Sequence, residues 1–344
     1  DCRFILGYDI QGEYDIIFAT AWFTAKVVRD CNSSAVKAYF IQDFEALFNP
    51  MGDGYILACN SYGYGLKPVT IGRWLSHKMQ TEYHTPSRYF DFCADRRIYR
   101  PLPEAKKEHA ICFVYQPDKP RRCSVLGIEA LGIVKFLRPD VKIYLYGSNI
   151  KGNVWFEHEN LGIIPLEKCN ALYNKCEAGL CISSSNPSRI PFEMMAAGLP
   201  VVDLYMENNF FDMPNEGVRL AHTTPESIAQ ALIEILDHPE QAAQMSEAGK
   251  RYMADKDLEH GFEQFYEAVS DMAARREPAE PAVYDRSYTR PAVSADVVMD
   301  EKLAEQSYAP PVIVDNSLFG RLKRVGFIRK SKLLRKLWYK LRGL

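Results

Sequence analysis

The residues from Ser183 to Asp203, SSSNPSRIPFEMMAAGLPVVD, form the stretch of this chain best suited to binding an anion. A polar loop precedes a short apolar segment that predicts a helix, and a Gly-Leu-Pro break then leads into a β-branched run that predicts a strand. The start of a helix carries free backbone N–H groups and the positive end of the helix dipole, so a phosphate is stabilised there. Glu193, near the first turns of this helix, is an acid that could face the same ligand. An ordinary α/β crossover with a capped helix also explains the pattern.

A second candidate for anion binding is the Pro/Arg loop Gln116 to Arg122, which follows a predicted strand from Ala110 to Tyr115. Arg121 and Arg122 suit a diphosphate because the planar guanidinium can donate two hydrogen bonds at once. The chain contains neither GxxxxGK[ST] nor a GxGxxG after a strand, so it shows no P-loop and no dinucleotide-binding fingerprint. Two alternating α/β domains with a cleft between them are compatible with dehydrogenases, kinases and glycosyltransferases, and a phosphate site built from these two loops narrows that choice.

Polar and aromatic residues follow two predicted buried strands in the first hundred residues, Tyr14 to Thr20 and Ala38 to Gln42. Open parallel sheets bind ligands at the carboxyl ends of their strands, which makes these residues candidates for lining a cleft. The candidates are Thr20, Trp22, Gln42, Asp43 and Glu45. Trp22 could equally be a core aromatic, and Asp43 could equally be a loop-capping aspartate.

Strand and helix patterns alternate along the chain, which predicts parallel sheets covered on both faces. The predicted strands and helices of the second half span 110–115, 124–137, 141–146, 166–175, 179–182, 201–205 and 225–237. We expect four regions: an N-terminal Rossmann-like domain (1–107), a second Rossmann-like domain that binds the ligand (108–275), a disordered Pro/acidic linker (276–318) and a basic amphipathic helix (319–344).

Composition is that of a soluble globular protein, with 47% hydrophobic and 25% charged residues among 344. The net charge of −2 argues against nucleic acid as a partner. Nine cysteines without CxxC pairs favour a reducing cytoplasm, and no apolar run is long enough to span a membrane. No cluster of metal-ligand residues is evident, so no metal is expected.

The C-terminal 26 residues hold ten Lys or Arg and no acid. Between Arg321 and Leu341, apolar residues recur at helical spacing among the basic ones, which is typical of a helix lying on an anionic membrane surface. We therefore expect a cytoplasmic protein that associates peripherally with the inner face of the cell membrane. A nucleic-acid-binding tail and a helix that docks on a partner protein are the alternatives.

The second half resembles the donor-binding domain of GT-B glycosyltransferases, in particular the large retaining family four. Those enzymes carry an E-x7-E signature followed by a small-residue helix and G-x-P-V-V, and Glu193 to Val202 (EMMAAGLPVV) matches the latter part. The resemblance implies that Glu193 binds the nucleotide ribose. The first acid would fall at position 185, where this chain has Ser185. This departure puts the usual contact with the donor sugar in doubt.

A subgroup that resembles bacterial surface-glycan rhamnosyltransferases, which use dTDP-L-rhamnose, carries a Ser/Pro-rich loop in place of that acid. Its P-x-x-P-R loop is matched by Pro117 to Arg121, and its aromatic strand Y-F-I-Q-D-F-E by Tyr39 to Glu45. The resemblance implies transfer of L-rhamnose onto a surface glycan, with nucleotide-sugar and glycan or lipid-linked oligosaccharide as partners and no cofactor. It also implies an N-terminal domain that is incomplete in this chain. A UDP- or GDP-sugar donor and a non-catalytic binding scaffold are the alternatives.

The expected chemistry is cleavage of a sugar–phosphate bond, which leaves extra negative charge on the diphosphate. Arg121 is expected to stabilise that charge and Asp43 to orient or deprotonate the acceptor hydroxyl. The candidate catalytic residues are therefore Asp43, Arg121 and Glu193. The candidate donor-binding residues are Arg121, Arg122, Gly147, Ser183, Ser184, Ser185, Asn186, Arg189 and Glu193.

Overall fold

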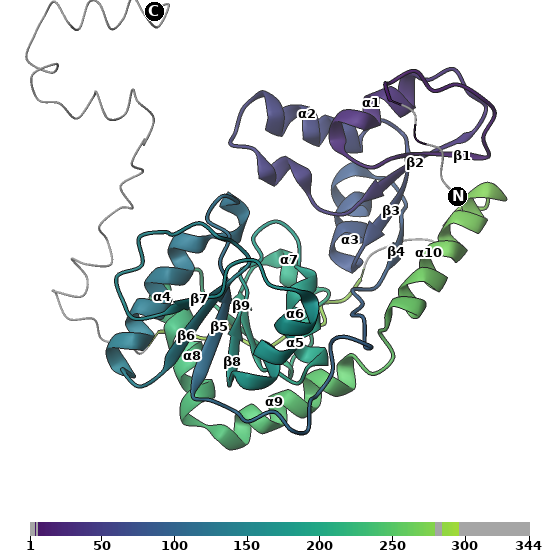
Figure 1. Cartoon of the computed structure of the whole chain (residues 1–344). Coiled ribbons are helices and arrows are strands. Elements are labelled where there is room, and N and C mark those ends of the chain that lie inside the picture. The colour runs from purple at the N-terminus through teal and green to yellow at the C-terminus, as the bar shows by residue number, and fades with distance from the viewer. Residues whose placement is uncertain (1–3, 5, 279–283, 296–344) are drawn as a thin grey trace, which may run out of the picture. The chain divides into compact units, whose positions relative to one another are not determined.

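The structure is a computed structural model that describes residues 4, 6–278 and 284–295 of the chain. These residues form two parallel β-sheets with helices packed around them (Figure 1). Strand and helix alternate through most of the chain, as the sequence pattern predicts. The prediction of an α/β fold with two parallel sheets is therefore confirmed.

The first sheet, called here the N-terminal sheet, has four parallel strands whose spatial order follows their order in the chain. The strands are β1 (Ile16–Ala19), β2 (Val36–Ile41), β3 (Lys67–Ile71) and β4 (Arg88–Phe90). Crossovers between them contain α1 (Trp22–Asp30), the 3₁₀ helix η1 (Glu45–Phe48), α2 (Asp53–Tyr62) and α3 (Arg73–Tyr83). Each crossover begins at the carboxyl end of a strand, which is the edge where the candidate residues after β1 and β2 lie.

The second sheet, called here the C-terminal sheet, has six parallel strands in the order β10-β9-β8-β5-β6-β7. They are β5 (Ala110–Val114), β6 (Lys142–Tyr146), β7 (Glu159–Asn160), β8 (Ala178–Leu180), β9 (Val201–Leu204) and β10 (Val218–Ala221). All five residues of β5 are buried, as expected for a strand covered on both faces. The chain continues from β5 to β6 on one side, while β8 pairs with β5 on the other. The loops that follow β5 and β8 are therefore neighbours at a topological switch point, where open α/β sheets bind ligands.

The helices of this second half agree closely with the sequence pattern. They are η2 (Pro120–Arg122), α4 (Ser124–Leu137), α5 (Leu166–Lys175), α6 (Arg189–Ala196), α7 (Glu207–Phe210), α8 (Pro225–Asp237) and α9 (Pro239–Tyr252). The predicted helices over 124–137, 166–175 and 225–237 have these bounds in the structure. Helix α8 begins as expected, because the Thr224 hydroxyl accepts a hydrogen bond from the Ser227 N–H at 3.3 Å.

Helix α10 (Leu258–Ala273) follows the C-terminal sheet in the chain but packs on the N-terminal sheet, beside β4 (Figure 1). The ring of Phe265 lies 5.3 Å from that of Phe40 and 5.7 Å from that of Phe90, measured between centroids. The structure thus differs from the expected domain boundary, which placed all of 108–275 together. Helical periodicity shows which face of α10 is apolar, but not which sheet that face covers.

Residues 284–295 also differ from the expectation of a disordered linker over 276–318. Tyr288 is buried, its N–H donates to the Phe210 carbonyl at 2.8 Å, and its hydroxyl accepts from the Leu220 N–H at 3.2 Å. Val293 forms a parallel bridge with Ala221 at the edge of the C-terminal sheet. Loss of periodicity does not distinguish an extended segment that packs from one that does not. The predicted basic helix over Arg321–Leu341 lies outside the described residues.

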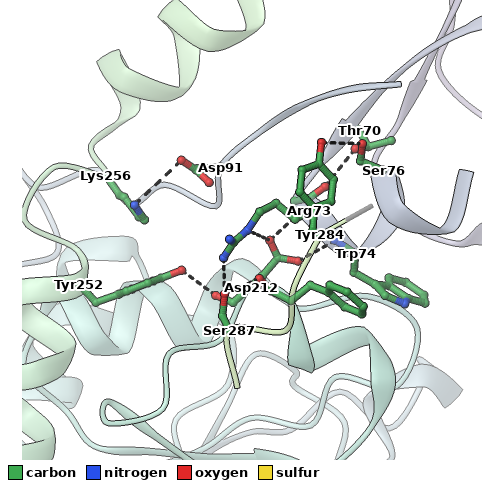
Figure 2. A network of polar contacts seen from close by, with 12 residues as sticks. Thr70, Arg73, Trp74, Ser76, Asp91, Asp212, Tyr252, Lys256, Tyr284 and Ser287 are labelled. Carbon is green, nitrogen blue, oxygen red and sulfur yellow. Dashed lines mark hydrogen bonds and ion pairs between the residues drawn. The ribbon is translucent and has the colours of Figure 1, made fainter. Parts of the chain in front are cut away.

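A buried carboxylate joins the two halves of the chain. Asp212, from the loop after α7, accepts hydrogen bonds from the backbone N–H groups of Arg73 at 2.8 Å and Trp74 at 3.1 Å (Figure 2). These N–H groups begin α3, so Asp212 caps a helix of the N-terminal sheet from the other half of the chain. Gly72, with φ +79°, permits this approach, because a Cβ there would clash with the ring of Phe92 and crowd the Asp212 carboxylate.

The 284–295 segment adds to this junction. The Arg73 guanidinium donates to the Ser287 hydroxyl (Figure 2). The Ser287 hydroxyl in turn donates to the Phe211 carbonyl at 2.9 Å. The Tyr252 hydroxyl, from the end of α9, donates to the main-chain carbonyl of Asp212 at 2.8 Å. Burial raises the pKa of Asp212 to about 6, although the two N–H donors of α3 oppose that rise.

We expect Asp212→Ala to lower the free energy of unfolding by about 2 kcal/mol, because it leaves two N–H groups at a buried helix start without an acceptor. Urea denaturation followed by circular dichroism measures this loss. Thr224→Ala, which removes a cap local to α8, is the matched control and should cost about 1 kcal/mol. An Asp212→Ala loss no larger than that of the control would show that the junction adds nothing beyond an ordinary cap.

Among the described residues, no helix is both long enough and apolar enough to span a membrane.

Candidate functional site

The loop Ser183 to Ser188, between β8 and α6, is held in place by buried polar contacts. The Ser183 N–H donates to Asp203 Oδ1 at 2.9 Å, and its carbonyl accepts from Asn208 Nδ2 at 2.8 Å. The Ser188 N–H donates to the Ser183 hydroxyl at 3.2 Å, and the Ser188 hydroxyl accepts from the Ile190 N–H at 3.3 Å, which caps α6. The polar loop before the helix is therefore preorganised.

The arginine loop after β5 packs against this serine loop. The Ser184 hydroxyl donates to the Arg121 main-chain carbonyl at 2.8 Å. The Arg121 guanidinium lies over the ring of Phe48, 4.3 Å from its centroid, so it also contacts η1 of the N-terminal sheet. The switch-point geometry thus brings together two loops that are about sixty residues apart in the chain.

The loop after β2 completes the site from the other half of the chain. The side-chain Nδ2 of Asn186 donates to the Gln42 main-chain carbonyl at 3.1 Å. Asp43 follows, and the Tyr62 hydroxyl donates to its main-chain carbonyl at 3.4 Å. The carboxyl edges of the two sheets therefore meet at these loops.

A cavity of about 310 Å³, called here the serine–arginine cavity, lies among these three loops. It contains nine of the predicted site residues: Gln42, Asp43, Arg121, Arg122, Ser183, Ser184, Ser185, Asn186 and Arg189. Ile71, Phe92, Pro187, Ser188 and Ile190 complete its lining. Ile71, Phe92 and Pro187 give the cavity an apolar lining in addition to its charged and polar residues.

Three arginines, Arg121, Arg122 and Arg189, and one carboxylate, Asp43, line the cavity and determine its electrostatics. Burial raises the pKa of Asp43 to about 6, while the Ser185 hydroxyl and the charges of Arg121 and Arg122 oppose the rise. Asp43 is the single carboxylate among the residues that line this cavity. A carboxylate with a pKa near neutrality is suited to accept a proton from a hydroxyl group.

Three buried polar atoms on the cavity residues have no hydrogen-bond partner in the described structure. They are Asp43 Oδ1, Arg122 Nε and Asn186 Oδ1. Buried polar groups are nearly always paired, so unpaired ones in one cavity indicate a ligand that pairs with them. That ligand must offer an acceptor to the arginine and donors to the two oxygens.

Two predicted acceptor-side residues have structural contacts instead of lining this cavity. Glu45 accepts a hydrogen bond from the Trp22 N–H at 2.6 Å and thereby satisfies the start of α1. Burial raises the pKa of Glu45, and the Trp22 N–H opposes that rise. The Trp22 ring packs edge-on against Phe23. The two residues are thus brought together, at the first turn of α1.

Glu193 and Gly147 also lie away from the serine–arginine cavity. Glu193 is mostly buried on α6, with the Tyr99 hydroxyl beside it and an Arg189 nitrogen 4.0 Å from its carboxylate. Burial raises the pKa of Glu193, while Arg189 and Tyr99 lower it. Gly147, with φ +100°, directly follows β6, and its carbonyl accepts from Gln116 Nε2 at 3.3 Å. Their predicted roles in donor binding remain predictions.

Asp203 is a residue of the site for which sequence reasoning assigned no role. It lies in β9, one residue before the end of the strand, is fully buried, and holds the serine loop through the Ser183 N–H. Burial raises its pKa to about 7, although N–H donors such as that of Leu204, at 2.7 Å, oppose this. An Asp directly after Val201-Val202 in an apolar run was the available signal, because a charge at a buried strand end needs partners.

No group of three or more potential metal ligands occurs in the described part of the chain. The donor set of the serine–arginine cavity is cationic and hydroxylic, and it suits an anion.

The architecture can now be compared with known proteins. A sucrose-phosphate synthase from Thermosynechococcus elongatus aligns with a TM-score of 0.64 at 15% identity, covering 76% of this chain and 74% of that one. HepE from Anabaena, solved in complex with UDP and glucose, aligns with a TM-score of 0.59 at 15% identity, covering 75% and 78%. Each alignment thus covers about three quarters of this chain. The chain has the GT-B fold.

Comparison of the amino-acid sequence with known proteins identifies two similar proteins or domains. Residues 109–233 match the family model described as WsaF, C-terminal domain. The O-antigen biosynthesis protein RfbC of Myxococcus xanthus is 30% identical over 229 residues, which cover 63% of this chain and 18% of RfbC. The chain thus spans less than a fifth of the length of this curated relative. The matched residues 109–233 include the arginine loop and the serine loop of the cavity.

Proposed function

We propose that this GT-B protein is a glycosyltransferase that takes a sugar from a nucleotide-diphosphate donor and adds it to a cell-surface glycan or glycan precursor. The observation that carries the proposal is the serine–arginine cavity, where Arg121, Arg122 and the start of α6 face Asp43 from the other half. The cationic side suits a diphosphate, and the carboxylate suits a hydroxyl group. The name of the Myxococcus relative, O-antigen biosynthesis protein, supports a surface glycan as the product.

The mechanism follows from where charge develops. As the sugar–phosphate bond breaks, the leaving diphosphate gains negative charge, which Arg121, Arg122 and the N–H groups at the start of α6 are placed to stabilise. Asp43 accepts the proton of the attacking acceptor hydroxyl. Glu193 binds the nucleotide ribose, and Arg189, at the rim of the cavity, contacts the diphosphate or the donor sugar. We propose that these residues perform the transfer with no metal or cofactor.

For the donor we propose dTDP-L-rhamnose, transferred with retention of configuration, which requires the acceptor hydroxyl to attack the sugar from the same face that the diphosphate leaves. The support is the Ser/Pro-rich loop at 183–188 together with the Pro-x-x-Pro-Arg loop at 117–121. A UDP- or GDP-sugar is the competing donor, supported by the complex of HepE with UDP and glucose. Competition of dTDP, UDP and GDP for the same site separates these donors, and the anomeric configuration of the product, read by NMR, tests retention.

A non-catalytic binding scaffold is the second candidate function. It is favoured by Ser185, which stands where the resembled family has an acid, and by the contact of Glu193 with Tyr99. The test incubates the full chain with a panel of nucleotide sugars and oligosaccharide or lipid-linked acceptors, with products detected by mass spectrometry. Transfer from one donor supports the enzyme, nucleotide binding without any transfer supports the scaffold, and absence of both rejects the site.

For the C-terminal region we propose peripheral attachment to an anionic membrane through Arg321–Leu341. Deleting residues 320–344 should move the protein from the membrane to the soluble fraction, because about 1 kcal/mol of attraction is lost with each basic residue near the surface. Fractionation of cells that express either form measures this change. The control is a variant in which residues 320–344 are replaced by an uncharged sequence of equal length, which removes the basic charge but keeps the chain length. Unchanged fractionation contradicts the attachment.

A further inference from the structure

The side chain of Asn186 lies between the two halves of the chain in a fixed orientation. It is 5% exposed, and its Nδ2 donates to the Gln42 main-chain carbonyl at 3.1 Å. A carbonyl oxygen only accepts hydrogen bonds, so the amide nitrogen must face Gln42. The amide oxygen, Oδ1, then has no partner, and the residue lines the serine–arginine cavity. The chain thus fixes an unpaired acceptor in a candidate donor pocket.

The other unpaired atoms define what this acceptor would meet. Asp43 Oδ1 is a second unpaired acceptor and Arg122 Nε an unpaired donor, on residues that line the same cavity. A buried donor or acceptor that has no partner is unfavourable, because it has lost its hydrogen bonds with water and gained none in return. A diphosphate oxygen satisfies the arginine, but it has no hydrogen to donate to the two oxygens. Hydroxyl groups attached to that diphosphate would satisfy them, which is the chemistry of a sugar diphosphate.

We propose that Asn186 recognises a hydroxyl of the transferred sugar through Oδ1, and that the Gln42 carbonyl orients its carboxamide for this contact. The inference rests on the proposed function and adds a substrate class to it. The sugar must be neutral and hydroxyl-bearing, because the carboxylate of a uronic acid would face an amide oxygen and the Asp43 carboxylate. The acceptor atom is correctly oriented only while the loop after β2 touches the serine loop, so recognition depends on both halves.

Isothermal titration of the full chain with UDP, dTDP, and neutral and uronic nucleotide sugars of the same base tests this. Asn186→Ala should weaken binding of the neutral nucleotide sugar about tenfold, which corresponds to one lost contact with a buried polar group. Affinity for the free nucleotide diphosphate should change by less than about twofold, because Oδ1 contacts only the sugar. The wild-type protein should bind the neutral nucleotide sugar at least about tenfold more tightly than the uronic one.

Asn208→Ala is the matched control. Asn208 holds the same loop, donating to the Ser183 carbonyl, and also has an unpaired Oδ1, but it does not line the cavity. Loss of a residue with a purely structural role should lower the affinities for the nucleotide and for the nucleotide sugar equally. We expect this result for Asn208→Ala. The inference is overturned if Asn186→Ala does the same, or if neutral and uronic sugars bind equally. A wild-type protein that binds no nucleotide at all rejects the proposed function itself.

Discussion

Asp43→Asn is expected to lower kcat for sugar transfer by about 10²–10⁴-fold, the range for loss of a general base. Affinity for the nucleotide diphosphate should stay within about twofold, because the carboxylate faces the acceptor and the sugar instead of the phosphates. Asn is nearly isosteric, so the contacts of the Asp43 main chain with Tyr62 remain. The measurement is steady-state transfer with a separate nucleotide titration.

The pH dependence of transfer gives a second readout of the same residue. Burial raises the pKa of Asp43 to about 6, so the base is protonated, and transfer slows, as pH falls through about 6. Ser185→Ala removes a hydroxyl that lowers the pKa, so the acidic limb should move to higher pH. Ser184→Ala is the control and should leave the acidic limb in place, because the Ser184 hydroxyl donates to the Arg121 carbonyl and does not lower the pKa of Asp43. An Asp43→Asn variant with wild-type kcat, or an acidic limb that Ser185→Ala leaves in place, contradicts the base assignment.

Replacing Arg122 by Ala is expected to lower kcat/KM by about 10²–10³-fold, the effect of removing one preorganised donor from a site that stabilises developing charge. Its Nε is buried and has no hydrogen-bond partner in the described structure, so this N–H is available to donate to the diphosphate. Arg122→Lys keeps the positive charge but loses the planar fork, and it should recover only part of the activity.

Lys119→Ala is the matched control for this prediction. Lys119 belongs to the same loop and carries the same charge, but it does not line the serine–arginine cavity. We expect its kcat/KM to remain within about threefold of wild type, since its half-buried side chain lies outside the cavity, away from the charge that develops there. Equal losses in Arg122→Ala and Lys119→Ala would mean that net charge, and not placement in the cavity, accounts for the effect.

The serine–arginine cavity depends on contacts made by distant parts of the chain. Asp212, Tyr252 and the 284–295 segment hold the start of α3 against the C-terminal half, and α10 covers the N-terminal sheet. The Asn186–Gln42 hydrogen bond joins the same two halves inside the cavity. Any change that separates the halves should therefore alter the orientation of Asn186 before it disturbs the phosphate-binding loops.

Local patterns predicted much of this architecture. The bounds of α4, α5 and α8 follow from helical periodicity and, for α8, from Thr224 and Pro225 at its start. The serine loop and the arginine loop were recognisable because polar residues follow buried strands, and parallel sheets collect such loops at one edge. These signals depend only on residues close together in the chain, so they can be recognised without knowing which elements pack against one another.

Sequence pattern could not show which candidates meet in space. Glu45 and Asp43 both follow the same strand, yet Glu45 satisfies the start of α1 while Asp43 lines the cavity. Their spacing carries no information about which N–H group or guanidinium lies opposite. Glu193 likewise stands in a recognisable motif, but its contact with Tyr99 depends on the path of the connection between the sheets.

By itself, the sequence determined the α/β class, the alternation of elements and the two loops suited to an anion, because periodicity and turn residues act over a few neighbours. Tertiary structure alone decided that α10 covers the N-terminal sheet, that residues 284–295 pack, that Asp203 holds the serine loop, and that Gln42 orients Asn186. Each of these depends on pairing between groups far apart in the chain. Burial and hydrogen-bond satisfaction select such pairs only after the whole chain has folded.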